Sequence, residues 1–268
     1  HYGGLVFKVH MTVGIWVLGD QLSLNQSALA SCEKNKADTP VILIEALSHI
    51  KERRYHKQKL VLLWSAMRHF AEALRAEGWQ VSYETAPSFE DPLKQWIRQN
   101  SITELQVMEP ADRPFSIFLE NLELPCDLVE TPNNHFLWST QDFEDWAATR
   151  KSLLMESFYR EGRKRFNILM DGKKPAGEKW NYDKENRKPP KGKISPPAPL
   201  LFEPDEITQD VIDNVNAADY ATFGTTEKFA WAVTRKQALA VLDDFVNDRL
   251  DTFGPYQDAM VTGEDTMW

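Results

Sequence analysis

The chain has 268 residues, a formal net charge of −9 at pH 7, 42% hydrophobic residues and nine tryptophans, enough to bury a substantial core in one large domain or two modest ones. It has no run of 18 apolar residues, and two cysteines, Cys32 and Cys126, cannot build a disulfide framework. We therefore expect no transmembrane helix, no membrane partner, no metal site and a cytoplasmic setting. Residues 1–11 lack a secretory signal and are expected to be a leader or an expression remnant.

Residues 12–135 alternate short β-rich runs with helical patterns, and we assign them to one α/β domain. Several of the β-rich runs are continuously apolar, which is typical of strands buried on both faces. Such alternation predicts a Rossmann-like, doubly wound, five-stranded parallel sheet. The predicted strands are 13–18, 40–45, 79–84, 104–109 and 126–130.

The clearest helix is predicted over 56–78, where apolar residues recur at three- and four-residue steps and Gly78 ends the pattern. Shorter helices are predicted over 88–100, with Ser88 as N-cap, and over 113–122. The apolar stripe of the long helix comprises Leu60, Leu63, Trp64, Met67, Phe70, Ala71 and Leu74.

Ligands of such sheets bind at the carboxyl ends of strands, near the reversal of strand order. That rule selects three places: "LGDQL" (18–22), Glu45 and "EPADR" (109–113). The first lacks the glycines of a dinucleotide fingerprint. Asp20 and Gln21 offer a carboxylate and an amide that can read the edge of a heterocycle, but taken alone the motif favours Asp20 as the cap of the next helix.

Glu45 ends an apolar strand, where a carboxylate needs a partner or a ligand. His49 follows four residues later and could lie nearby, although a structural or exposed role is the simpler interpretation. His56 and His69 have no neighbours at metal-ligand spacing, and no serine lies in a nucleophile elbow.

The pattern changes after residue 131. One helix is predicted over 139–170, capped at Ser139 or Thr140, and the segment to 207 is a linker because seven of the 15 prolines lie between Pro175 and Pro204. Helices resume over 208–220 and 234–250. We divide this part into a helix with a basic, proline-rich linker (136–207) and the start of a helical domain (208–268).

A basic belt interrupts the acidic chain. Residues 151–193 carry 13 Lys and Arg side chains against six Asp and Glu. Such a belt indicates either a local anionic partner or a solvated linker. Within "EKWNYDKENRK" (178–188), Trp180 and Tyr182 could stack on bases or pin the segment to the domain, and we favour pinning, with Arg187 and Lys188 outward.

Long blocks of the sequence are specific enough to indicate a family. "LGDQLS" (18–23), "AMRHFAE" (66–72) and "WNYDKENR" (180–187) resemble the cryptochrome/photolyase-related proteins of bacteria, the iron–sulfur bacterial cryptochromes and (6-4) photolyases. The resemblance runs in collinear order over residues 12–268. It implies an antenna domain that binds 6,7-dimethyl-8-ribityllumazine, then a linker, then a helical domain that binds FAD and a [4Fe–4S] cluster.

In that family the photoexcited flavin repairs (6-4) lesions in DNA, so the resemblance implies DNA as the partner of the full-length protein. The family's FAD site and cluster cysteines lie beyond residue 268, and we expect this chain alone to bind neither cofactor and not to repair DNA unaided. Two alternatives stay open. The protein could be a cryptochrome that signals to a protein partner, or a stand-alone small-molecule-binding α/β module.

The resemblance also implies site residues. Gly19, Asp20, Gln21 and Leu22 match the lumazine-contacting turn, and Glu45 and Leu63 match residues beside the same pocket. His49 joins them as a candidate chromophore contact, and Arg187 with Lys188 matches a DNA-facing position. Where the family tends to carry Glu and Tyr near the chromophore, this chain has His49 and Glu52, which exchanges a stacking aromatic for a charge.

Overall fold

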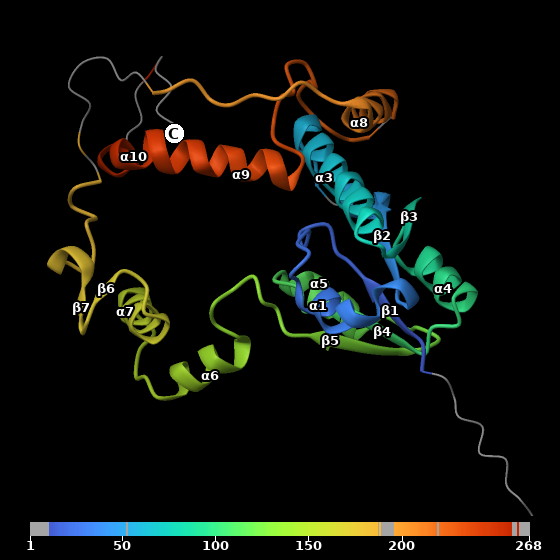
Figure 1. Cartoon of the computed structure of the whole chain (residues 1–268), viewed down its shortest axis with the longest axis horizontal. Coiled ribbons are helices and arrows are strands. Elements are labelled where there is room, and N and C mark those ends of the chain that lie inside the picture. The colour runs from blue at the N-terminus through green and yellow to red at the C-terminus, as the bar shows by residue number, and fades with distance from the viewer. Residues whose placement is uncertain are drawn as a thin grey trace, which may run out of the picture. The chain divides into compact units, whose positions relative to one another are not determined.

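The computed structural model describes residues 11–51, 53–186, 188, 196–218, 220–258 and 262, without the side chain of His49. The described residues form two compact units (Figure 1). The first comprises those within His1–His135 and Glu203–Thr234, and the second those within Phe136–Phe202 and Arg235–Trp268. Among these residues, no helix is both long and apolar enough to cross a membrane.

The first unit is built on a five-stranded sheet in which every neighbouring pair is parallel. The strand order is β3-β2-β1-β4-β5, so the order reverses between β1 and β4. This confirms the predicted Rossmann-like α/β fold. The strands are β1 (Val13–Trp16), β2 (Pro40–Ala46), β3 (Gln80–Ala86), β4 (Glu104–Met108) and β5 (Asp127–Thr131).

Helices of the first unit follow the strands in the predicted alternation. The sequence did not predict α1, η1 and α2, because segments of five or six residues are too short to show a helical period. The helical elements are α1 (Ser27–Cys32), η1 (Glu33–Asp38), α2 (Leu47–Lys51), α3 (Lys57–Ala76), α4 (Glu90–Gln99), α5 (Arg113–Glu120) and α8 (Glu206–Ala217).

Alternation along the strands divides the apolar core between the two faces of the sheet. Ile15 of β1 and Leu43 of β2 pack with α1, α3 and α8, whereas Trp16 and Ile42 pack with α4 and α5. Both faces are therefore covered, as the continuously apolar strands predict.

α3 confirms the predicted long helix and its end. Gly78 adopts a φ of +93°, a left-handed conformation that glycine adopts without steric cost. The predicted stripe is buried except for Phe70, which is partly buried, and Leu63, which remains 36% exposed. Leu63 thus lies at the edge of the buried face and not within it.

Two predicted caps are wrong. Phe89, and not Ser88, is the residue before α4, and its side chain makes no capping hydrogen bond. The negative charges of Glu90 and Asp91 in the first turn stabilise the positive end of the helix dipole instead. Asp20 caps no helix, since the amide oxygen of Gln26 accepts the N–H of Ala28 at the start of α1.

α8 belongs to the first unit, whereas the sequence pattern places residues 208–268 together in a helical domain. Thr208, Val211 and Val215 are buried, and the two valines join the core on the α3 face of the sheet. Hydrophobic burial against α3 therefore draws 203–234 back onto the α/β unit.

In the second unit, the single helix predicted over 139–170 is wrong, because two helices occupy this segment. α6 (Thr140–Ala148) begins at a capping box of Ser139 and Asp142, as Ser139 predicts. It ends where the hydroxyl of Thr149 donates to the carbonyl of Trp146 at 2.8 Å, and α7 (Met155–Phe166) follows. The remaining elements are β6 (Met170–Asp171), β7 (Lys174–Pro175), η2 (Ala176–Glu178), α9 (Arg235–Asp244), η3 (Phe245–Arg249) and α10 (Leu250–Tyr256).

Candidate functional site

A cavity of about 230 Å³ lies at the carboxyl edge of the sheet in the first unit. The loop after β1 (17–20), the end of β2 (44–46), and Pro110 and Asp112 after β4 contribute to its walls. This is the reversal of strand order, where parallel sheets leave room for ligands. All three places selected from the sequence meet there.

Three aromatic rings form one side of the cavity. Trp16 comes from β1, Phe89 precedes α4 and Phe115 lies in the first turn of α5. The ring centroids are 5.4 Å apart for Trp16 and Phe89, 5.5 Å for Phe89 and Phe115, and 5.9 Å for Trp16 and Phe115. The sequence did not predict this wall, although aromatic residues where a helix begins after a strand are a signal for it.

α3 forms the facing wall through Leu63, Trp64 and Met67. Gly19 packs closely against it: a Cβ at this position would lie 3.0 Å from Sδ of Met67 and 3.5 Å from Cδ1 of Leu63. Gly19 is not among the described glycines with positive φ, so close approach to α3, and not turn geometry, favours glycine here.

Two carboxylates face the cavity with their charge available to a ligand. Asp20 is exposed and lines the wall after β1. Asp112 caps α5, where Oδ2 accepts the backbone N–H of Phe115 at 3.2 Å, and also lines the cavity. Carboxylate oxygens accept hydrogen bonds only, so this edge suits ligand groups that donate them.

Gln21 and Leu22, also predicted as contacts, are not among the lining residues. Gln21 is 2% exposed, and its Nε2 donates to the carbonyl oxygens of Met108 at 2.8 Å and Glu109 at 3.4 Å. It therefore ties the loop after β1 to the end of β4. Leu22 packs against the core on the α3 face of the sheet.

Glu45 lines the cavity, and its carboxylate is surrounded by hydrogen-bond donors of the protein. It is 2% exposed, and its carboxylate accepts hydrogen bonds from Arg68 Nε at 2.9 Å, the Tyr83 hydroxyl at 2.5 Å and the Thr85 hydroxyl at 3.2 Å. The sequence left open whether the carboxylate of Glu45 binds a protein partner or a ligand, and the structure shows that it has protein partners. Burial first, and then the negative charge of Glu45, raise the pKa of Tyr83.

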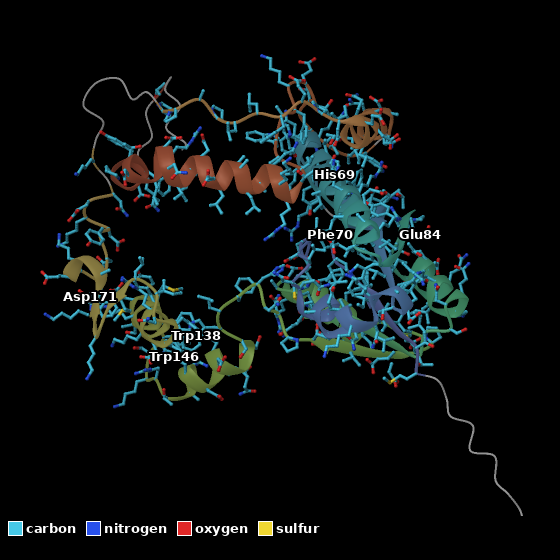
Figure 2. All side chains as sticks on the ribbon, in the orientation of Figure 1. His69, Phe70, Glu84, Trp138, Trp146 and Asp171 are labelled. Carbon is cyan, nitrogen blue, oxygen red and sulfur yellow. The ribbon has the colours of Figure 1, made fainter. Side chains whose placement is uncertain are left out.

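Arg68 extends this network to α8. Its Nη1 lies 2.5 Å from Oδ2 of Asp210. Burial lowers the pKa of Arg68, but the hydrogen bonds and negative charge of Glu45 act against burial, and the pKa is raised. The next residue of α3, His69, lies 3.1 Å through its Nε2 from Oδ2 of Asp205, the N-cap of α8; Figure 2 labels His69 on this helix. One ion pair, Arg68 with Asp210, and one polar contact, His69 with Asp205, thus hold α8 against the helix that walls the cavity.

Three residues discussed from the sequence lie wholly or partly outside the described residues: Arg187, Glu52 and the side chain of His49. Lys188 is described and exposed, and its backbone N–H donates to the carbonyl of Pro255 at 3.2 Å. Among the residues that the structure describes, no group of three or more His, Cys, Asp and Glu side chains could hold a metal ion.

Within the basic belt, Trp180 packs on the side chains of α7. The cationic groups of Arg160, Arg163 and Lys164 lie 5.4, 5.4 and 5.5 Å from the centre of its ring. Arg163 is 7% exposed and donates to the backbone carbonyls of Ile168 and Trp180. These contacts anchor the segment around Trp180 by its aromatic ring.

Tyr182 makes a weaker anchor, since it is 43% exposed and its hydroxyl donates to the carbonyl of Gly177 at 3.2 Å. A separate cluster in this unit joins α6 and α7, with the ring centroids of Trp146 and Phe158 4.9 Å apart and those of Trp138 and Phe158 4.7 Å apart. Figure 2 labels both tryptophans.

Comparison with known proteins finds one family and two relatives. Residues 15–231 match the family described as deoxyribodipyrimidine photo-lyase-related protein. A (6-4) photolyase of Agrobacterium fabrum is 39% identical over 257 residues, which cover 92% of this chain and 50% of the relative. Uncharacterized protein R852 of Acanthamoeba polyphaga mimivirus is 28% identical over 150 residues, 53% of this chain and 76% of that protein. The chain thus spans about half the length of the (6-4) photolyase.

Proposed function

The chain belongs to the deoxyribodipyrimidine photo-lyase-related protein family, and from that membership we propose that it is the antenna-chromophore-binding portion of a photolyase-like flavoprotein that repairs (6-4) lesions in DNA. The single observation that carries the antenna role is the cavity at the carboxyl edge of the sheet. FAD and a [4Fe–4S] cluster are proposed for the full-length protein and not for this chain.

The chemistry of the cavity fits a ribityllumazine. A lumazine is a flat bicyclic ring with carbonyl acceptors and a ring N–H donor, and the cavity combines aromatic walls with the acceptor-only carboxylates of Asp20 and Asp112. When bound, the chromophore supplies light absorption and passes its excitation to the flavin. Rigid, water-excluding walls favour this role because they limit competing loss of the excitation.

Each part of the cavity has a task in this proposal. Trp16, Phe89 and Phe115 pack on the ring and exclude water, while Leu63 and Met67 close the side formed by α3. Glu45 supports the wall through Arg68 and Tyr83, since its described hydrogen bonds come from the protein. Gln21 holds the loop after β1 in place beneath the site.

For the basic belt we propose contact with DNA phosphates. Trp180 anchors the segment on α7, and the exposed Lys188, with Arg187 next to it in the chain, supplies positive charge. Phosphate contacts strengthen binding without reading sequence, which suits a protein that must find a lesion in any context.

The absorption spectrum of the purified protein tests the antenna role, followed by mass analysis of any small molecule that acid releases. We expect a ribityllumazine, either retained on purification or bound when added. A protein that stays colourless after incubation with the lumazine would contradict the antenna role and would leave the family membership unchanged.

A further inference from the structure

A second cavity, of about 350 Å³, adjoins the first at the carboxyl edge of the sheet. Phe89, Asp112 and Phe115 line both cavities, so the two meet at these side chains. The second cavity extends from there toward α2 and the loop before α3. Its other lining residues are Ser48, Arg53, Tyr55, Pro114 and Phe118.

The two cavities differ in chemistry. Among the described residues that line the first, there is no Lys, Arg or His, and its charged groups are carboxylates. The second adds two hydroxyl-bearing residues, Ser48 and Tyr55, and the guanidinium group of Arg53. An apolar compartment next to a polar one suits a ligand that has an apolar end and a hydroxylated end.

Among the described residues that line the two cavities, Arg53 is the one positively charged side chain. It is exposed, and no ion pair joins it to another described residue. A guanidinium without a carboxylate partner remains free to bind an anionic group, and its planar fork matches the oxygens of a phosphate.

We propose that the two cavities form one site for a ligand with a flat heteroaromatic ring and a hydroxylated chain, and that Arg53 favours chains that end in a phosphate. The inference rests on the proposed function for the ring, which occupies the first cavity. The chain enters the second cavity past Phe89 and Phe115. A phosphate monoester carries about −1.5 to −2 charges at pH 7, so it gains most from the guanidinium of Arg53 in the wall of the second cavity.

Riboflavin and flavin mononucleotide test the proposal, because they share ring and ribityl chain and differ by one phosphate. Their dissociation constants are measured by fluorescence titration for the wild type, Arg53→Ala and Arg54→Ala. Arg54 is a matched control, exposed and absent from the lining of both cavities. We expect the wild type and Arg54→Ala to bind flavin mononucleotide roughly tenfold more tightly than riboflavin, and Arg53→Ala to lose this preference.

The preference in the wild type should also shrink as salt is added, because Arg53 is exposed and its charge is screened. Equal affinities in the wild type, or a preference that survives Arg53→Ala, would overturn selection by Arg53 while the ring site stands. If the two flavins and added ribityllumazine all fail to bind, the ring site itself is absent, and the proposed function falls with the inference.

Discussion

At the scale of residues, a buried carboxylate links the cavity to the surrounding fold. Burying a charge is costly unless donors replace water, and Glu45 receives them from α3 through Arg68 and from β3 through Tyr83 and Thr85. The same contacts fix the spacing between α3 and the sheet. We therefore expect changes in this network to alter stability before they alter ligand contacts.

Arg68→Met should lower the free energy of unfolding by about 3 kcal/mol, since it leaves Glu45 buried without its counterion. Arg75→Met is the control on the same helix: Arg75 pairs with Glu72 at 2.6 Å on the surface, and losing such a pair costs less than about 1 kcal/mol. Urea denaturation measures both variants. Equal losses would show that the Glu45 pair contributes no more than a surface pair.

Tyr83→Phe should change the pH dependence of stability above pH 10. The pKa of Tyr83 is raised in the folded state from an ordinary value of 10.0, so the folded protein keeps a proton that the unfolded chain releases. Stability from this group is complete below pH 10 and is lost as pH rises, by up to about 1.4 kcal/mol per pH unit. Denaturation of both proteins between pH 8 and 11 measures the difference, and parallel profiles would contradict the prediction.

Leu63→Trp should fill the cavity and weaken chromophore binding by at least about tenfold, because an indole occupies space that the ring needs. Leu62→Trp is its control: Leu62 is 38% exposed, close to the 36% of Leu63, but does not line the cavity. Both variants should keep the wild-type melting temperature. Lumazine affinity is measured by fluorescence titration, and an equal effect of both variants would argue against this cavity as the site.

At the scale of elements, α8 completes the α/β unit from a distant part of the sequence. It buries Val211 and Val215 against the core on the α3 face and adds the pairs of Asp205 with His69 and Asp210 with Arg68. A helix that presents a buried apolar stripe, an ion pair and a polar contact to α3 behaves as part of that unit.

Val215→Ala should therefore destabilise the sheet by about 2 kcal/mol, although the residue lies far from the strands in sequence. Gln209→Ala, an exposed position on the same helix, should change stability by less than about 0.5 kcal/mol. Amide hydrogen exchange of β1 and β2 measures both. Unchanged protection in Val215→Ala would mean that α8 is not part of the cooperative α/β unit.

At the scale of the whole molecule, charge is distributed so that an acidic chain carries a local basic segment. The net charge of −9 disfavours unspecific attraction to DNA, whereas residues 151–193, with 13 Lys and Arg against six Asp and Glu, offer an anionic partner a local attraction. Confining positive charge to one segment favours a defined orientation on an anionic partner.

The test uses a protein that contains this chain and is as long as its (6-4) photolyase relative. In that protein, Arg187→Ala should weaken DNA binding several-fold without changing sequence preference. It should also reduce the slope of log affinity against log salt by about 1. Arg98→Ala, an exposed arginine on α4, is the control and should leave both unchanged. An unaltered salt slope in Arg187→Ala would contradict the phosphate contact.

Local sequence patterns were enough to predict the sheet, the long helix α3 and the edge of the sheet at which the cavity lies. These features follow from local patterns: apolar runs of strand length, a helical period ended by Gly78, and polar residues directly after strands, such as Asp20 and Asp112. The belt in the second unit was likewise visible as a run of basic and aromatic residues.

The contacts of these residues follow from tertiary packing and not from local patterns. Glu45 meets Arg68 across 23 residues, and Arg68 meets Asp210 across 142, separations at which no local period predicts a contact. The aromatic wall of Phe89 and Phe115, the break after α6 and the place of α8 depend equally on packing between elements. Local periodicity shows which face of an element is buried, whereas its partner is chosen by long-range burial and charge pairing.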